Sequence, residues 1–159
     1  MPGPRVTQGV RAPLFDRLAA SGGGAAGGAK GESPRMLDRE GLGASLAREL
    51  DRLLNTRTPL SADDLGRRPR STLDYGLPDL SLFWPHNPDS ETRLAALITD
   101  TVAAFEPRLL RPRVTVERVG NERAKLRAVV SGEIMLDGMV EPVTFPILLT
   151  DSVEDTNDE

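Results

Sequence analysis

The chain changes its apolar repeat at one point, Pro107, and this change limits the folds that it can form. Before Pro107 the apolar residues recur at helical spacing, and beyond it they alternate as in a strand. A residue that precedes a proline is pushed out of the α region, so the helix must end near Phe105 and Glu106. Helices therefore come first and strands afterwards, an order that predicts an α+β fold.

Two long helices are expected before this point. The first covers about residues 38–54, and five leucines form its buried stripe: Leu42, Leu46, Leu50, Leu53 and Leu54. The second follows Pro88, with Asp89 or Ser90 as its N-cap. Its buried face consists of Leu94, Leu97, Ile98, Val102 and Phe105. Between them lies a polar loop and then a single short turn, with Ser71 as N-cap, Gly76 as a left-handed stop and Pro78 as a breaker.

Three strands are expected after the proline, at residues 114–119, 124–136 and 140–149. Gly120-Asn121 marks the first turn, and Asp137-Gly138 between alternating runs is a strong signal for a two-residue hairpin. The predicted inward-facing side chains are Leu126, Ala128, Val130, Ile134 and Leu136, then Val143, Phe145, Ile147 and Leu149. We expect an antiparallel meander with two long helices and a short one on one face, forming one domain over residues 36–150.

The two edges of this meander differ. Pro142 and Pro146 are four residues apart, so both lack an N–H on the same side of the last strand. That side cannot pair continuously. The open edge able to accept a strand from a partner is therefore expected at residues 114–119, with Val114 and Val116 as candidate binding residues.

The two ends of the chain have a different composition. Residues 1–13 contain Pro and Gly and little that could pack, and residues 19–33 form a Gly/Ala-rich spacer. The GGAKG inside this spacer is not a phosphate-binding loop, because no Ser or Thr follows the lysine and no strand precedes it. Between them, Leu14, Phe15 and Leu18 form a tethered apolar plug for docking on the domain or on a partner. Residues 151–159 are expected to be an acidic, disordered tail.

Composition excludes several classes of function. The chain has 159 residues and a net charge of −4, and it lacks the long basic run of a nucleic-acid binder. It contains no cysteine, which rules out disulfides, thiolate catalysis and cysteine-ligated zinc. No apolar run approaches the roughly 20 residues that span a bilayer. We expect a cytoplasmic protein without membrane insertion, since the first residues contain no secretory signal pattern.

No set of residues predicts catalysis, a metal site or a cofactor. The single histidine, His86, lies among prolines in FWPHNP and has no second histidine or cysteine to share a metal. The carboxylates Asp74, Asp79 and Glu106 are the candidates for glycosidase chemistry, which requires a general acid in an apolar pocket. Glu106 is instead followed by three arginines within seven residues, which favours ion pairing.

Glu106, Pro107 and Arg108 form a corner that permits two interpretations. In one, the two charged side chains form an internal salt bridge that holds the helix against the sheet. In the other, Pro107 fixes the direction of the chain, and a partner grips both charges. The stiffness that Pro107 gives this corner favours the second interpretation.

Several motifs together resemble a known family. In chain order they are LFDRL at residues 14–18, LLNTR at 53–57, YGLPDL at 75–80, EPRL at 106–109 and EPVTF at 141–145. Their order and spacing over residues 14–149 resemble the lysozyme-like baseplate wedge family of contractile tails, and most closely its TssE branch in type VI secretion systems. The motif residues with an expected structural role are Asn55, Thr56, Arg57, Tyr75, Gly76 and Pro78.

The resemblance implies a non-enzymatic role in assembly. It implies partners among the baseplate wedge subunits (TssF, TssG and TssK-like proteins) and the sheath proteins (TssB and TssC-like), with the sheath beginning to assemble on the baseplate. It also implies that Glu106, Pro107, Arg108 and Leu109 hold the chain in the baseplate. The alternatives are a wedge protein of a phage or phage-like injection particle and, more distantly, a peptidoglycan hydrolase.

Overall fold

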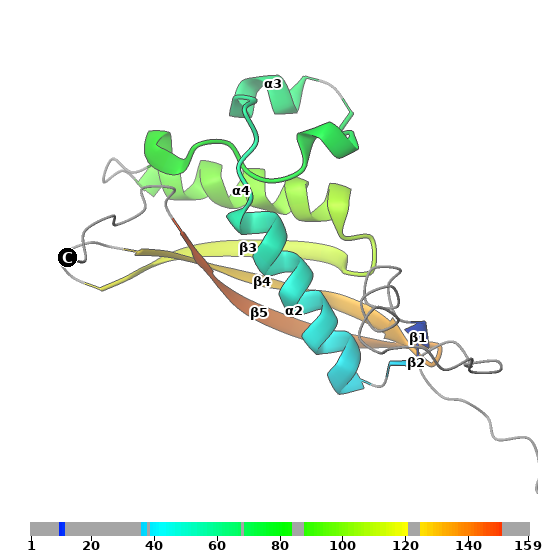
Figure 1. The fold of residues 1–159 in the computed structure, drawn as a ribbon. Coiled ribbons are helices and arrows are strands. Elements are labelled where there is room, and N and C mark those ends of the chain that lie inside the picture. Colours follow the sequence, from blue (N-terminus) through cyan, green and yellow to red (C-terminus); the bar gives the residue numbers. More distant parts are fainter. Residues whose placement is uncertain are drawn as a thin grey trace, which may run out of the picture.

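The computed structural model describes residues 10–11, 36–37, 39–67, 69–83, 88–120 and 125–150 (Figure 1). The predictions for the apolar plug at residues 14–18, the spacer at 19–33, His86 and the tail at 151–159 lie outside these described residues.

The two long helices form where the apolar stripes predict them. Helix α2 spans Arg39–Asn55 and helix α4 spans Pro88–Phe105. Helix α4 ends one residue before Glu106, as the following proline requires. Its predicted N-cap is wrong, because the helix already begins at Pro88 and therefore places Asp89 and Ser90 in its first turn. Proline fits this position because the first N–H groups of a helix have no partner within the helix.

Short helical segments connect α2 to α4. Helix α3 spans Ala62–Gly66 within the segment that was expected to be a polar loop. It begins where the Ser61 hydroxyl accepts a hydrogen bond from the Asp64 N–H, an N-cap that the sequence analysis missed. Two 3₁₀ turns follow, η1 at Thr72–Asp74 and η2 at Leu80–Phe83. The predicted start at Ser71 is confirmed, since its N–H donates to Asp74 Oδ2 at 2.8 Å.

The sheet is the expected antiparallel meander. Strands β3 (Leu110–Val119), β4 (Lys125–Leu136) and β5 (Met139–Leu149) lie in the order β3-β4-β5. The two-residue hairpin is confirmed by positive φ angles of 51° at Asp137 and 81° at Gly138. Strand β3 begins at Leu110 rather than at 114, through an irregular pairing in which Arg111 has a φ of 48°.

The hydrophobic core lies between the helices and one face of the sheet. Figure 1 shows α2 crossing the strands and α4 running alongside β3. The predicted inward residues of β4 and β5 are buried in this core together with the leucine stripe of α2, except that Val143 is half-buried. The described part of the chain is thus an α+β fold with two long helices and a three-stranded sheet.

A second, small pairing lies beside the start of α2. Strand β1 (Val10–Arg11) pairs antiparallel with β2 (Met36–Leu37), which immediately precedes α2. Residues 10 and 11 lie in the part that was expected to have little that packs, and they form a short backbone pairing. Two residues are too few to give a recognisable alternation, so no local pattern could have revealed the pairing.

Candidate functional site

The corner at Glu106, Pro107 and Arg108 is built around an internal ion pair. Two parallel hydrogen bonds join the side chains, from Arg108 Nε to Glu106 Oε1 at 2.7 Å and from Arg108 Nη2 to Oε2 at 2.5 Å. The Arg108 backbone N–H also donates to Oε1, at 3.2 Å. This fork geometry is the strong form of an arginine–carboxylate pair, and it satisfies a carboxylate placed at the unfavourable C-terminal end of a helix.

The same pair ties the corner to α2. Glu106 is only 5% exposed, whereas the Arg108 side chain is 27% exposed. Arg108 Nη1 donates to the hydroxyl of Ser45, a buried residue of α2, at 3.3 Å. The geometry is that of the internal clamp. Glu106 has little surface left for a partner. Contact between this corner and a partner stays a prediction, and Pro107 and the exposed part of Arg108 have the surface for it.

Leu109 completes the corner from the inside. Its side chain is buried in the core. The predicted contact between Leu109 and a partner therefore has no exposed surface in the isolated chain. It lies against Gly132 of β4, where an added Cβ would be 2.8 Å from Leu109 Cδ1 and 2.9 Å from the Leu110 carbonyl oxygen. Gly132 is therefore required for this close approach, and the sequence analysis did not single it out.

Asn55 and Arg57 join the end of α2 to the end of the sheet. The Asn55 amide donates to the Leu148 carbonyl at 3.1 Å, and its Oδ1 accepts from the Thr150 N–H at 2.9 Å. Arg57 donates through Nη1 to the Leu54 carbonyl at 2.9 Å and through Nη2 to the Thr150 carbonyl. These bonds give the LLNTR motif a function in joining helix to strand.

Thr56, Gly76 and Leu77 join the same helix end to the YGLPDL segment. The Leu77 N–H donates to the Thr56 carbonyl at 2.9 Å, and the Thr58 N–H donates to the Leu77 carbonyl at 2.8 Å. Gly76 has a φ of 106°, and a Cβ at this position would lie 2.5 Å from the Thr56 carbonyl oxygen. The two motifs are thus halves of one backbone junction.

Tyr75 extends this junction to α4. Its ring meets Phe105 edge-to-face, with centroids 5.4 Å apart and planes at 69°. Burial, followed by the nearby charge of Glu49, raises the pKa of the Tyr75 phenol. Pro78 is buried in the same segment. This places the YGLPDL motif within the fold rather than on a free surface.

The outer edge of β5 is interrupted by its prolines. In an antiparallel ladder the N–H and C=O of one residue point to the same side, and successive residues alternate. Pro142 and Pro146 have no N–H to donate to β4. The backbone N–H and C=O groups of alternate residues 140–148 of β5 therefore point away from β4. Leu148 is in the same phase, and its carbonyl indeed accepts from Asn55 of α2. This edge is therefore both short of donors and capped at one end by α2.

The edge of β3 has a proline near its start, Pro112, and is continuous from Val114 to Arg118. Val129 of β4 lies opposite Pro146 of β5 on one side and opposite Thr115 of β3 on the other. The backbone N–H and C=O of Val129 therefore point toward β3. Thr115 must then face β4, which leaves the N–H and C=O groups of Val114, Val116 and Arg118 on the outer side. In the part of the chain that the structure describes, no strand pairs with this side. The side chains of Val114 and Val116 pack against the core, so their backbones, not their side chains, are available to a partner.

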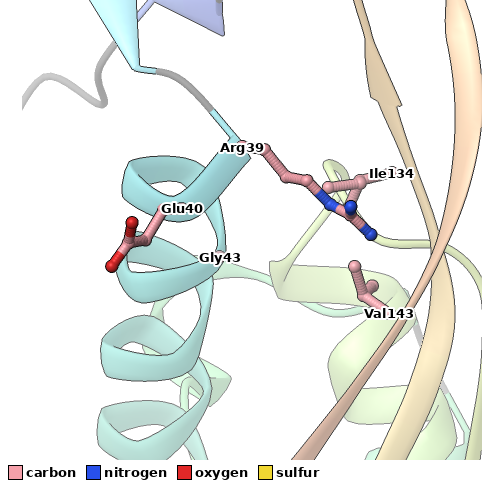
Figure 2. Close-up of a pocket in the computed structure, with 5 residues that line it drawn as sticks. All are labelled: Arg39, Glu40, Gly43, Ile134 and Val143. Atoms are coloured by element: carbon pink, nitrogen blue, oxygen red, sulfur yellow. The ribbon is translucent and has the colours of Figure 1, made fainter.

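A groove lies between the first turn of α2 and the strands β4 and β5 (Figure 2). Its cavity volume is about 490 Å³, and it is lined by Arg39, Glu40, Gly43, Ile134 and Val143. Arg39 extends toward the strands, where its Nε lies 2.8 Å from Glu141 Oε2, while Glu40 points away. Its apolar walls come from Ile134 of β4 and Val143 of β5. No local pattern indicates the groove, because its walls come from segments that are distant in the chain.

The carboxylates weighed for catalysis have other partners. The Ser81 N–H donates to Asp79 and, as the main cause, lowers the pKa of that carboxyl, which is the opposite of what a general acid needs. Asp74 is buried and accepts from the N–H and the hydroxyl of Ser71. Within the described ranges, no cluster of three or more His, Cys, Asp or Glu residues could hold a metal ion. No described helix is both long and apolar enough to cross a membrane.

The sequence profile of the family described as baseplate wedge protein gp25 matches residues 40–138. This chain belongs to that family. The matched range contains α2 from its second residue, α4, the corner at Glu106 and strands β3 and β4, so the resemblance inferred from the motifs is confirmed at the level of the family.

Among solved structures, the fold of this family member is similar to a chain in a structure titled "The baseplate complex from the type VI secretion system". The TM-score is 0.50 and the sequence identity is 21%, and the match covers 70% of this chain and 96% of the other. At this identity the match supports the fold. No curated protein matches the chain by sequence.

Proposed function

We propose that this chain is a non-enzymatic wedge subunit of a type VI secretion baseplate that acts in the cytoplasm. Membership of the baseplate wedge family supports the wedge role. The likeness in fold to a chain of a type VI baseplate complex favours that system over a phage-like particle. The paired or hydrogen-bonded states of Asp74, Asp79 and Glu106 support a role without catalysis.

The observation that carries the proposal is the unpaired edge of β3. Its outward backbone groups at Val114, Val116 and Arg118 can accept an extended segment as a fourth strand, with main-chain hydrogen bonds supplying affinity. We assign this edge to a strand of the sheath proteins (TssB and TssC-like), which would start sheath assembly on the baseplate. The corner at Pro107 and Arg108, which directly precedes β3, is assigned to the wedge subunits (TssF, TssG and TssK-like).

Val116→Pro should abolish pairing of a sheath strand with β3 and leave wedge binding intact. The substitution removes an outward-pointing N–H, so it takes one donor from the open edge without removing a hydrogen bond to β4. We expect a loss of sheath assembly in a reconstitution with the wedge and sheath proteins, followed by sedimentation and electron microscopy.

Thr144→Pro is the matched control, because Thr144 is in the outward phase of β5, between Pro142 and Pro146. It should leave the pairing of a sheath strand with β3 unchanged. Melting curves of both variants verify folding, since Val116 also packs partly against the core. Sheath assembly at the normal rate on a folded Val116→Pro variant would contradict the assignment of the β3 edge.

The purified protein should not hydrolyse peptidoglycan. Its candidate carboxylates are held by hydrogen bonds or by an arginine rather than placed in an apolar pocket beside a substrate cleft. The measurement is the turbidity of a cell-wall suspension, with a lysozyme as the positive control. Clearing that disappears in the Glu106→Gln variant would overturn the non-enzymatic proposal.

A further inference from the structure

The face of the sheet that points away from the helices is unusually apolar along β5. Its outward residues are Val140, Pro142, Thr144, Pro146 and Leu148, all of them exposed. Val140 is 50% exposed and Leu148 is 42% exposed. A sheet with one solvated face ordinarily carries polar side chains there, so this strand departs from the expected alternation.

The apolar strip continues onto the neighbouring strand. Met135 lies directly opposite Val140 and is 49% exposed, and the half-buried Val129 lies opposite Pro146. These apolar side chains lie on both sides of a small polar pair, Ser131 and Thr144, at the middle of the two strands. We call the surface formed by Val129, Met135, Val140, Pro142, Pro146 and Leu148 the apolar strip.

The other half of this face is cationic. Two cross-strand pairs neutralise four of its charges, Arg127 with Glu117 at 2.8 Å and Arg111 with Glu133 at 3.2 Å. Arg113 and Lys125 are exposed on the same face, and neither side chain has an ion-pair partner in the described part of the chain. Among the described residues, this face therefore has a net charge of +2, although the whole chain has a net charge of −4.

We propose that this outer face is a second docking surface, which binds an apolar and acidic surface of another subunit of the same baseplate. The apolar strip would supply the buried centre of the interface, and Arg113 and Lys125 would meet carboxylates at its rim. The partner packs against the face rather than extending the sheet, because Pro142 and Pro146 interrupt the adjacent edge. The proposal rests on the proposed function, which supplies the baseplate.

The charge balance selects a protein partner. An anionic membrane or a nucleic acid is bound through many basic residues, whereas the described part of this face has two cations beyond its ion pairs, on an acidic chain. A protein surface with a few carboxylates beside an apolar patch matches both halves of the face. The backbone at Pro142 and Pro146 is already restricted, so ordering it on binding costs little entropy.

The lack of cysteine allows a direct test in the full-length protein. Thr144→Cys places a unique thiol in the middle of the outer face, and Ala103→Cys places one on the exposed side of α4 as a control. Maleimide labelling is measured for each variant free and in the purified complex with the TssF and TssG wedge subunits. We expect assembly to slow labelling of Cys at position 144 by at least about tenfold and to leave position 103 nearly unchanged.

Charge reversal gives an independent measurement. The double variant Arg113→Glu with Lys125→Glu should weaken binding to the wedge subunits by about tenfold and reduce its dependence on salt. The matched control, Arg67→Glu with Arg93→Glu, makes the same change in net charge at exposed positions on α3's C-cap and on α4. It should alter binding by no more than about twofold.

The outcomes separate this inference from the proposed function. A complex that forms with unprotected Cys at position 144 and normal affinity after charge reversal overturns the docking surface and leaves the wedge role standing. Failure of the unmodified protein to bind the wedge subunits overturns both. Binding to vesicles of anionic lipid that charge reversal abolishes would replace the protein partner with a membrane surface and overturn the proposal.

Discussion

Arg108→Ala should lower the free energy of unfolding by about 3–5 kcal/mol, the cost of leaving a buried charge without its partner. Glu106 would keep only the backbone N–H of residue 108 as a donor, at the helix end where a carboxylate is least favoured. The link to Ser45 on α2 would also be lost. Chemical denaturation followed by circular dichroism measures the change, in a domain small enough for two-state analysis.

The double variant Glu106→Gln with Arg108→Gln separates the ion pair from the packing of the two side chains. Removing both charges leaves no unpaired carboxylate, so this variant should be more stable than Arg108→Ala. Arg108→Lys should fall between them, because lysine keeps the charge and loses the two parallel hydrogen bonds. A stable Arg108→Ala protein that no longer binds the wedge subunits would instead establish the gripped corner.

The sequence favours a corner that a partner binds, because it shows the charged residues and does not show which side chains they contact. Pro107 and the run of arginines indicate a rigid charged corner, but nothing local tells that Arg108 turns back onto Glu106. Arg108 also donates to Ser45, which lies 63 residues away in the chain. A stiff corner suits a clamp as well as a surface, because a fixed chain direction lowers the entropy cost of forming the ion pair.

The elements themselves were readily predicted, because their signals are periodic or local. The leucine stripe of α2, the end of α4 before Pro107 and the hairpin at Asp137-Gly138 each follow from one short pattern. The bulge at Arg111 that starts β3 early, the junction between Thr56 and Leu77 and the groove beside Arg39 do not. Each of these requires two segments whose meeting is decided by the tertiary fold.

The prolines of β5 identify from sequence which edge of the sheet can accept a further strand. Pro142 and Pro146 identify, from sequence, the side of β5 that cannot pair, and the observed register then fixes the phase of every residue across β4 to β3. The outward groups at Val114 and Val116 follow from that chain of pairings. The inward direction of the two valine side chains does not follow from these pairings, because it depends on the packing of the sheet against the helices.

Gly76→Ala should destabilise the protein by about 3 kcal/mol or more, the second large effect that we expect. An alanine at a φ of 106° is strained by about 1–3 kcal/mol, and its Cβ would lie 2.5 Å from the Thr56 carbonyl oxygen. That oxygen accepts the Leu77 N–H, so the clash must open the junction between the end of α2 and the YGLPDL segment. The measurement is the midpoint of urea denaturation.

Gly138→Ala isolates the backbone strain from the clash. Gly138 also has a positive φ, 81°, yet an added Cβ there meets nothing within 4 Å. The free energy of unfolding of this variant should therefore fall only by the backbone strain, about 1 kcal/mol for a left-handed alanine in a turn. Because Tyr75 adjoins Gly76 and packs on Phe105, opening the junction should also change the fluorescence of Tyr75 in the folded protein. Equal destabilisation by the two variants would show that the contact with Thr56 does not hold the helix end in place.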